Sequence, residues 1–278
     1  MTGPEALTYL FVPGNRPERF AKALASGADR IILDLEDAVA PADKAGARAA
    51  IAQWMAGTDE DRKKVLIRIN DAATDWHAED LALAGAVKAA SVMLPKCEAA
   101  SQIAATLIQL AHGASVLPLI ETARGMLALQ EIAAAPGVAR LAFGSLDYMV
   151  DLDIPADSPA LDFAATQIAV ASRAAGLAAP VAGVTPVLDA ARVATDMAHA
   201  RRLGFGAKMC IHPSQLEAVR TALTPDAAEL AWAQRVLQAW TTSCGGAMQL
   251  DGRMVDRPVV LRAERIVAQA ARTRHPPG

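Results

Sequence analysis

The sequence predicts an α/β fold, a TIM (β/α)₈ barrel followed by a C-terminal helical extension. Short apolar runs rich in branched side chains alternate with alanine-rich stretches, which is typical of βα units around a parallel sheet. Eight such runs occur, and a chain of 278 residues suits one barrel of about 250 residues. We therefore expect a catalytic barrel domain over residues 1–222 and, over residues 223–278, an extension that serves as a lid and subunit contact.

The expected strands follow one another at intervals that leave room for helices between them. In chain order they are Leu7–Val12, Arg30–Leu35, Val65–Ile69, Ser91–Pro95, Ser115–Ile120, Ala139–Phe143, Pro180–Val184 and Ala207–Ile211. Because all carboxyl ends of parallel strands open on the same side of a barrel, residues that leave different strands converge on one cleft.

Composition excludes several classes of function. The net charge of −3 gives no reason to expect nucleic acid or an anionic membrane as a partner. The N-terminus lacks a basic start before its apolar run, and no uncharged apolar stretch reaches about 18 residues, so we expect a cytoplasmic protein. Cys97, Cys210 and Cys244 lie far apart without zinc-ligand spacing and are interpreted as reduced, buried thiols. No GxSxG, P-loop or GxGxxG motif occurs.

The stretch Val116–Asp151 contains two strand–helix units, each with an acid at the end of its strand. Glu121 follows the first strand and Asp147 the second, so both carboxylates face one cleft. Carboxylates that share a cleft repel each other unless a cation lies between them, and oxygen ligands favour Mg²⁺ over zinc. Thr122 is expected to cap a helix over Ala123–Ala134. In the alternative to a metal site, Glu121 is an acid stabilised by the dipole at the N-terminus of that helix, and Asp147 forms a turn.

The second and third expected strands bring further charge to the same cleft. Asp34, Glu36 and Asp37 lie within four residues, and alternation points the first two to the same side. Buried acids are costly without partners, so Glu36 and Asp37 are candidates for substrate binding. Arg68 can bind a substrate carboxylate through two parallel hydrogen bonds, or it can pair with Asp34 or Glu36.

A basic cluster follows the first expected strand. Arg16, Arg19 and Lys22 lie beside the start of an expected helix from Glu18 to Ser26, so they can hold an anion such as a phosphate. The alternative is a solvated basic helix face.

Two lysines can also reach the mouth of the barrel. Lys96 follows the fourth strand and Lys208 lies in the eighth, and either amine can form a Schiff base with a carbonyl substrate or pair with a carboxylate. His212 after the eighth strand has a packing or hydrogen-bonding role.

Beyond the barrel, a helix over Pro225–Ser243 ends at Gly245–Gly246. A hairpin-like segment over Ala247–Val255 and a last helix over Val259–Arg272 follow. The reactive groups of this extension are Asp251 and Asp256.

Five separated motifs together resemble one known family. They are LFVPGNRPERFAKALASGADRIILDLEDAVAPADK, VLIRIN, LPLIETARG, FGSLDYMVDL and GAKMCIHPSQ. In this order they resemble the citrate lyase β-subunit-like branch of the HpcH/HpaI aldolases, whose members include malyl-CoA and citramalyl-CoA lyases.

The resemblance implies a TIM barrel, often in homotrimers or hexamers, with Mg²⁺ on Glu121 and Asp147. Arg68 matches the family residue that contacts the carboxylate or carbonyl of the substrate. The segment GGAMQLDGRMVDRPVVLRA resembles the tail of stand-alone CoA-ester lyases, whose acid/base aspartate reaches a neighbouring subunit and matches Asp256. Citrate lyase β subunits, which use an acyl carrier protein, often lack that tail. The chain departs from the family in its seventh strand, where Val181–Ala182–Gly183 replaces an IDG-type sequence.

From the resemblance we expect a Mg²⁺-dependent lyase that cleaves a β-hydroxyacyl-CoA to acetyl-CoA and a 2-oxo acid. The alternatives are a metal-dependent aldolase acting on free hydroxy-oxo acids, a citrate lyase β subunit acting on an acyl carrier protein, and a non-catalytic subunit.

Overall fold

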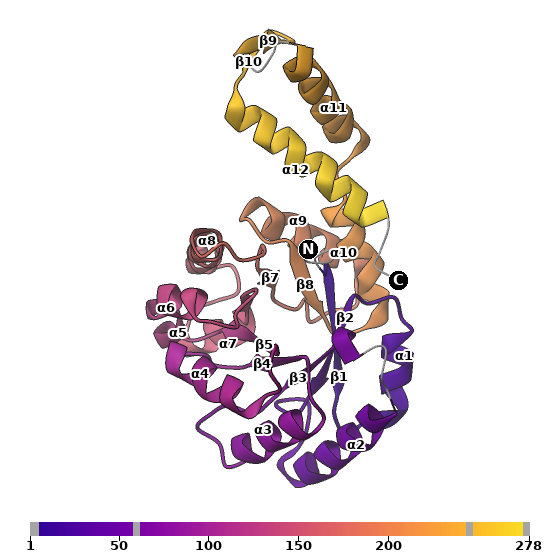
Figure 1. The fold of residues 1–278 in the computed structure, drawn as a ribbon, viewed down its shortest axis with the longest axis vertical. Coiled ribbons are helices and arrows are strands. Elements are labelled where there is room, and N and C mark those ends of the chain that lie inside the picture. Colours follow the sequence, from indigo (N-terminus) through magenta and orange to yellow (C-terminus); the bar gives the residue numbers. More distant parts are fainter. Residues whose placement is uncertain (1–5, 58–61, 243–246, 275–278) are drawn as a thin grey trace. The chain divides into compact units, whose positions relative to one another are not determined.

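The computed structural model describes residues 6–57, 62–242 and 247–274. Eight parallel strands close into a barrel in sequence order, with β8 paired to β1 (Figure 1). The strands are β1 (Thr8–Pro13), β2 (Arg30–Asp34), β3 (Val65–Arg68), β4 (Ser91–Leu94), β5 (Ser115–Ile120), β6 (Ala142–Phe143), β7 (Val181–Ala182) and β8 (Ala207–Cys210). The predicted fold class is confirmed.

Helices follow the strands and surround the barrel (Figure 1). They are η1 (Pro17–Arg19), α1 (Phe20–Leu24), η2 (Pro41–Asp43), α2 (Lys44–Ala56), η3 (Arg62–Lys64), α3 (His77–Ala86), α4 (Ala100–Gln109), α5 (Ala123–Leu127), α6 (Leu129–Ala134), α7 (Ser145–Leu152), α8 (Pro159–Ala174), α9 (Ala190–Arg202), η4 (Pro213–Gln215) and α10 (Leu216–Leu223).

The barrel interior is filled by side chains, because alternate residues of each strand point inward. Each strand contributes at least one residue to this core, which contains Ala6, Tyr9, Ile32, Leu66, Met93, Leu117, Leu119, Ala142, Val181, Ala207 and Met209. Polar side chains continue the inward alternation where the strands end. Asp34 lies two residues after Ile32, Arg68 two after Leu66, and Glu121 two after Leu119.

The structure differs from the sequence-based prediction in three local features. The expected helix over residues 123–134 breaks at Ala128 into α5 and α6, and Ser145–Leu152, which contains the Asp147 that the alternative interpretation placed in a turn, forms α7. Strands β6 and β7 are two residues each, since Pro180, which has no N–H for a ladder, precedes β7 and Val138 makes only an isolated bridge to Val116. The cap on α5 is confirmed, because Thr122 accepts a hydrogen bond from Gly125 N at 3.0 Å.

A second compact unit begins at Arg220 and has its own apolar core. It contains α11 (Ala227–Thr242), β9 (Met248–Leu250), β10 (Arg253–Val255) and α12 (Arg257–Arg274). The expected hairpin is present: β9 and β10 pair antiparallel around Asp251 and Gly252, whose φ angles of 51° and 75° suit a two-residue turn. The role of this unit as a lid or subunit contact stays a prediction, and Gly245–Gly246 lies outside the described residues.

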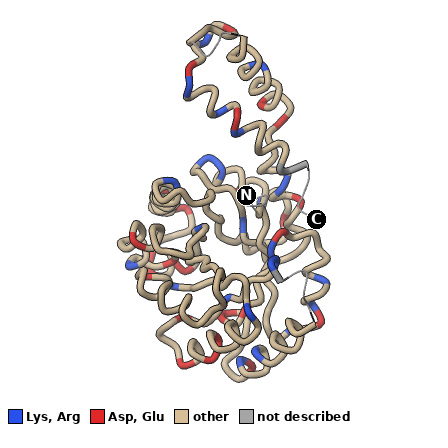
Figure 2. Tube along the Cα trace, in the orientation of Figure 1, with Lys and Arg blue, Asp and Glu red and all other residues tan. Residues whose placement is uncertain are grey.

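The two units differ in charge. Residues 220–278 contain eight Lys and Arg against five Asp and Glu, whereas residues 6–219 contain 19 against 24. Figure 2 marks these positions along the chain. The C-terminal unit is therefore basic and the barrel acidic.

No helix among the described residues is both long enough and apolar enough to cross a membrane. The expected cytoplasmic location stays a prediction. Cys97 and Cys210 are buried, as expected, and Cys244 lies outside the described residues.

Candidate active site

A cavity of about 360 Å³ opens at the carboxyl ends of the barrel strands. Its lining combines charged side chains with an apolar wall and consists of Phe11, Asp34, Asp37, Ala38, Arg68, Leu119, Glu121, Gly144, Ser145, Leu146, Asp147, Val184, Met209 and Ile211. Acids from the second, fifth and sixth βα units thus face one space, as the parallel strand order predicts.

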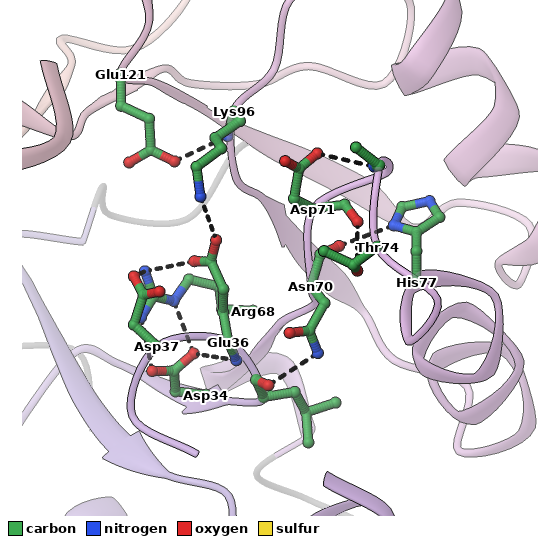
Figure 3. A network of polar contacts seen from close by, with 12 residues as sticks. Asp34, Glu36, Asp37, Arg68, Asn70, Asp71, Thr74, His77, Lys96 and Glu121 are labelled. Carbon is green, nitrogen blue, oxygen red and sulfur yellow. Dashed lines mark hydrogen bonds and ion pairs between the residues drawn. The ribbon is translucent and has the colours of Figure 1, made fainter. Parts of the chain in front are cut away.

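Arg68 is the centre of the charged network on one side of this cavity (Figure 3). Its Nε and NH2 each donate to one carboxylate oxygen of Asp34 at 2.7 Å, a bidentate pair with both side chains almost fully buried. Its NH1 lies 2.8 Å from Glu36 Oε2 and 3.6 Å from Asp37 Oδ2. Arg68 therefore adopts the ion-pair role that the sequence left open, while it also lines the cavity.

Only one edge of the Arg68 guanidinium, formed by Nε and NH2, is held by hydrogen bonds to Asp34. Burial has the largest single effect and lowers the pKa of Arg68, but the carboxylates of Asp34, Glu36 and Asp37 together outweigh it and raise that pKa overall, so the group stays charged. The NH1 contact with Glu36 is an ion pair without hydrogen-bond alignment, and Glu36 Oε2 accepts no hydrogen bond from the described residues. The NH1 edge is therefore the part of Arg68 that can still bind a substrate oxygen.

Lys96 connects the two sides of the mouth. Its backbone has a φ of 43°, an uncommon left-handed conformation for a residue with a side chain. In this conformation its N–H donates to Glu121 Oε1 at 2.8 Å, and its Nζ donates to Glu36 Oε1 at 3.0 Å (Figure 3). Burial has the largest single effect and lowers the pKa of Lys96, but the carboxylates of Glu36, Glu121 and Asp37 together outweigh it and raise that pKa overall. A charged amine is a poor nucleophile, so the carboxylate-pairing interpretation fits Lys96 better than a Schiff base.

Glu121 is the least compensated acid of the site. Its side chain is buried and makes no ion pair within the part of the chain that is described. Burial raises the pKa of Glu121 to about 8, and the negative charges of Glu36 and Asp147 add to the effect. Gly144 makes room for the carboxylate, since a Cβ there would lie 2.2 Å from Glu121 Oε2.

Asp147 reaches the same cavity from α7. Its position differs from the strand end or turn predicted from the sequence, because Asp147 lies in the first turn of a helix. An acid in that position also stabilises the helix dipole. The structural and the metal-binding interpretations of Asp147 are therefore compatible.

The pair of Glu121 and Asp147 suits a hard cation better than a soft one. Both donors are carboxylates that face one cavity, and Glu121 is buried beside like charge. No group of three His, Cys, Asp or Glu side chains is placed to hold a metal ion among the described residues. A cation here would complete its coordination with substrate oxygens and water, as Mg²⁺ commonly does in proteins.

Comparison with known proteins shows to which family this chain belongs. Residues 7–213 match the HpcH/HpaI aldolase/citrate lyase family, about three quarters of the chain. The chain belongs to the HpcH/HpaI aldolase/citrate lyase family. A citrate lyase subunit beta-like protein of Mycobacterium tuberculosis is 40% identical over 269 residues, 94% of each chain.

Two further similar proteins are informative. A (3S)-malyl-CoA thioesterase of Cereibacter sphaeroides is 30% identical over 268 residues, 95% of this chain and 94% of that protein. The crystal structure of CitE from Mycobacterium tuberculosis in complex with magnesium, acetoacetate and coenzyme A has a TM-score of 0.86 and 36% identity. That comparison covers 96% of this chain and 98% of the other.

The basic cluster predicted from the sequence to hold an anion lies apart from the cavity lining. Arg16 and Arg19 are exposed on and before η1, and each approaches Glu18 Oε1, at 3.9 Å and 3.8 Å. Lys22 is exposed on α1, which is only five residues long. The cluster remains free to contact a large ligand, and its role stays a prediction.

Lys208 does not reach the mouth, and the prediction that its amine points there is wrong. Ala207 and Met209 point into the barrel core, so alternation turns Lys208 outward. Its buried Nζ donates to Gly183 O at 2.6 Å. His212 accepts a hydrogen bond from Ser214 N at 3.2 Å, a local structural role.

The acids of the extension lie in the C-terminal unit. Asp256 is half-buried before α12 and receives a long hydrogen bond of 3.4 Å from Val259 N, as a helix cap does. Asp251 is exposed and pairs with Arg235 at 3.0 Å. The hydrogen bond from Val259 N occupies only part of the acceptor capacity of the Asp256 carboxylate. This contact is therefore compatible with a catalytic role, which stays a prediction.

Sequence reasoning missed the buried polar residues that support the site. Lys44, Asn70 and Asp80 are almost fully buried. Lys44 donates a hydrogen bond to Asn70, which in turn donates one to Asp80. One signal was available: Lys44 occupies a position on the buried face of α2 that Ala47 and Ile51 continue. A lysine on an apolar helix face needs a specific polar partner.

Proposed function

We propose that this protein is a Mg²⁺-dependent lyase that cleaves a β-hydroxyacyl-CoA of the malyl-CoA or citramalyl-CoA type to acetyl-CoA and a 2-oxo acid. The observation that carries the proposal is the shared cavity of Glu121, Asp147 and Arg68, which combines an uncompensated acid pair with a guanidinium edge. The similar mycobacterial protein crystallised with magnesium, acetoacetate and coenzyme A supports the ligand classes.

The residues divide the chemistry among them. Mg²⁺ bound at Glu121 and Asp147 would lower the pKa of the substrate hydroxyl and stabilise charge on its oxygen. The NH1 edge of Arg68 would bind the carboxylate or the emerging carbonyl oxygen. The hydroxyl proton would pass to water as the carbonyl forms and the C–C bond breaks, and the electron pair of that bond would enter the thioester enolate. Asp256 would then deliver a proton to the enolate carbon.

The bulk of the substrate would lie outside the cavity. Coenzyme A carries phosphates, and Arg16, Arg19 and Lys22 form an exposed basic cluster on and beside η1 and α1. We assign the phosphates to this cluster, because exposed cations bind phosphate without having to break a buried ion pair. Glu36 and Asp37 would act beside Arg68, setting which of its donors face the substrate.

We infer that Asp256 acts in trans, in a homotrimer or hexamer. The unit that carries Asp256 is basic whereas the barrel is acidic, and such a charge difference favours docking between copies. In a closed ring the same contact repeats, so that each barrel would receive one aspartate from a neighbour.

Thioester hydrolysis is the second candidate function. It is favoured by the 30% identity to a (3S)-malyl-CoA thioesterase, a protein whose name describes release of CoA rather than acetyl-CoA. An aldolase acting on free hydroxy-oxo acids and a subunit acting on an acyl carrier protein remain the other candidates.

One assay separates these functions. Purified protein is incubated with malyl-CoA, citramalyl-CoA or the corresponding free acids, with Mg²⁺ or with EDTA, and the products are identified by mass spectrometry. We expect acetyl-CoA and a 2-oxo acid only with CoA ester and Mg²⁺. Free CoA with an intact hydroxy acid would identify a thioesterase, and turnover of the free acids would identify an aldolase. Turnover of an acyl-carrier thioester but not of CoA esters would identify a citrate lyase subunit.

The trans arrangement is tested by mixing two inactive variants, Glu121→Gln and Asp256→Asn. Mixed oligomers should recover part of the activity, because some sites would combine an intact metal pair with an intact aspartate. Native mass spectrometry establishes that subunits exchange. Mixed oligomers without activity would place Asp256 in its own barrel or remove it from catalysis, and an active Asp256→Asn variant would decide for the latter.

A further inference from the structure

Lys44 lies at the start of α2, and its amine is enclosed between two loops of the barrel mouth. The residue is 4% exposed. Its Nζ donates to Leu35 O at 2.7 Å, to Glu36 O at 2.8 Å and to Asn70 Oδ1 at 2.7 Å. All three N–H donors of the ammonium are therefore used, two of them on the loop that carries Glu36.

The contacts of Lys44 continue into the body of the barrel. Asn70, which directly follows Ile69 beyond β3, donates through Nδ2 to Leu35 O at 2.8 Å and to Asp80 Oδ2 at 2.6 Å. Asp80 on α3 is fully buried and receives Arg48 NH1 from α2 at 3.0 Å. This chain of contacts joins the loop after β2 to α2, α3 and the end of β3.

The arrangement is costly, which indicates that it does more than fill space. Lys44 has no carboxylate within ion-pair distance among the described residues, and burial lowers its pKa. Its nearest ring is Trp76, 5.0 Å from Nζ. A buried ammonium that binds only carbonyl and amide oxygens forgoes the usual partner of a buried charge.

The loop held by Lys44 determines where the donors of Arg68 point. Asp34 precedes Leu35 and binds two guanidinium nitrogens, while Glu36 follows it and lies 2.8 Å from NH1. Asp34 also accepts hydrogen bonds from Glu36 N at 2.9 Å and Ala38 N at 3.2 Å. A shift of Leu35 and Glu36 would therefore change both anchors of the guanidinium.

We propose that Lys44 is a positioning residue that fixes the loop over residues 35–39 and thereby aims the NH1 edge of Arg68 at the substrate oxygen. The inference rests on the proposed function, in which Arg68 binds that oxygen. Lys44 touches no substrate itself, and its effect is transmitted through Glu36 and Arg68.

The test compares Lys44→Met with Arg140→Met. Met keeps most of the volume of Lys44 and removes its three donors. Arg140 is a matched control: a buried cation that also donates to backbone carbonyls, Ala6 O and Ala179 O, but at the opposite, amino-terminal end of the barrel. Pyruvate and glyoxylate binding with Mg²⁺, Mg²⁺ binding alone, and amide hydrogen exchange over residues 35–39 are measured for each.

For Lys44→Met we expect 2-oxo acid binding to weaken by at least about tenfold and exchange over residues 35–39 to accelerate, with Mg²⁺ affinity within about threefold of wild type. Arg140→Met should lose stability without either effect. Unchanged exchange and acid binding in Lys44→Met would overturn the inference, and so would equal changes in both variants.

A second variant keeps the test valid if Lys44→Met fails to fold. Asn70→Ser retains Lys44 but removes the Oδ1 acceptor, and it should change acid binding in the same direction by a smaller factor. If Asn70→Ser leaves acid binding and loop exchange unchanged, the inference fails. Arg68→Lys separates the proposed role of Arg68 from that of Lys44. Normal 2-oxo acid binding in Arg68→Lys would overturn the role of Arg68 in binding the substrate. Amide exchange over residues 35–39 in Lys44→Met would still decide whether Lys44 holds the loop.

Discussion

The buried acids on the two sides of the barrel mouth differ in whether cationic side chains pair with them. On the side of β2, β3 and β4, Asp34 and Glu36 contact Arg68 and Lys96 at 2.7–3.0 Å. On the side of β5 and β6, Glu121 is equally buried, yet no cationic side chain among the described residues forms an ion pair with it, and its pKa is raised to about 8.

This difference teaches which acids the fold can use for binding a cation. An acid that is already paired with arginine gains little from a metal ion, because binding one would break a buried ion pair. An acid buried beside other negative charge gains most from an external cation. Burial alone does not distinguish the two sides, and only the partners do.

The largest expected effect separates the two sides directly. Glu121→Gln and Asp147→Asn should each reduce Mg²⁺-dependent turnover on the order of 1000-fold or more, since each removes charge from a two-carboxylate site. Glu121→Gln should not lower the free energy of unfolding of the metal-free protein. Calorimetry with Mg²⁺ and urea unfolding measure the two quantities. Unchanged Mg²⁺ binding in both variants would refute the metal assignment.

Asp34→Asn is the matched control from the paired side. It breaks a buried bidentate pair, so we expect the free energy of unfolding to fall by about 3–5 kcal/mol. Its Mg²⁺ affinity should stay close to that of the wild type. An Asp34→Asn protein that lost Mg²⁺ binding but kept its stability would reverse the comparison.

Arg68→Lys is expected to have the next largest effect. Lysine keeps the charge but cannot hold Asp34 with two parallel hydrogen bonds while offering a further N–H to substrate, so kcat/KM should fall about 100-fold. Steady-state kinetics over a range of substrate concentrations measures this. Near-normal kinetics together with lowered stability would assign Arg68 a structural role alone.

The raised pKa of Glu121 predicts a pH dependence of stability. Between its ordinary value of 4.5 and about 8, folded metal-free protein retains a proton at Glu121 that the unfolded chain has released. The contribution of Glu121 to the free energy of unfolding therefore falls as pH rises through this window. Mg²⁺ competes with that proton, so the increase in Tm that Mg²⁺ causes should be larger at pH 8.5 than at pH 6.

Thermal unfolding with and without Mg²⁺ at both pH values measures this effect. In Glu121→Gln both the extra pH dependence and the Mg²⁺ effect should disappear. A Mg²⁺ effect on Tm that is the same at the two pH values would contradict the raised pKa of Glu121.

The smallest expected effect concerns Lys96, the residue that joins the two sides. Borohydride added with pyruvate or glyoxylate should leave no adduct on the protein, because the amine of Lys96 is held charged by Glu36. Intact-protein mass spectrometry detects such an adduct, and activity lost in EDTA should return with Mg²⁺. A stable adduct on Lys96 would establish imine chemistry and make the metal dispensable.

The barrel fold and several residues that line the cavity at its mouth could be predicted from the sequence. Both follow from period-two alternation and from the parallel direction of the strands. Glu121, Asp147 and Arg68 lie on one cavity for that reason. The pairing of Arg68 with Asp34 was one of two open alternatives, since alternation gives the side on which a residue points but not the rotamer that selects its partner.

Other features could not be predicted because they depend on contacts distant in sequence. Lys44 and Asn70 are 26 residues apart and meet only when β2 and β3 pair. Lys208 points outward because of the register of β8, a strand of four residues. A shift of one residue would turn its side chain inward, and the sequence alone does not determine this register. Helix α7 begins with Ser145, Leu146 and Asp147 after Gly144, a start that turn propensity describes equally well.

Gly144 lies beside the candidate metal pair without contributing any chemical group. Its φ of −88° is open to every amino acid, so the requirement is steric alone: a methyl group there would occupy the space of the Glu121 carboxylate. In a saturation mutagenesis screen for activity, Gly144 should therefore score as intolerant as a catalytic side chain. Even alanine would displace Glu121, and an inventory of reactive groups would overlook the position entirely.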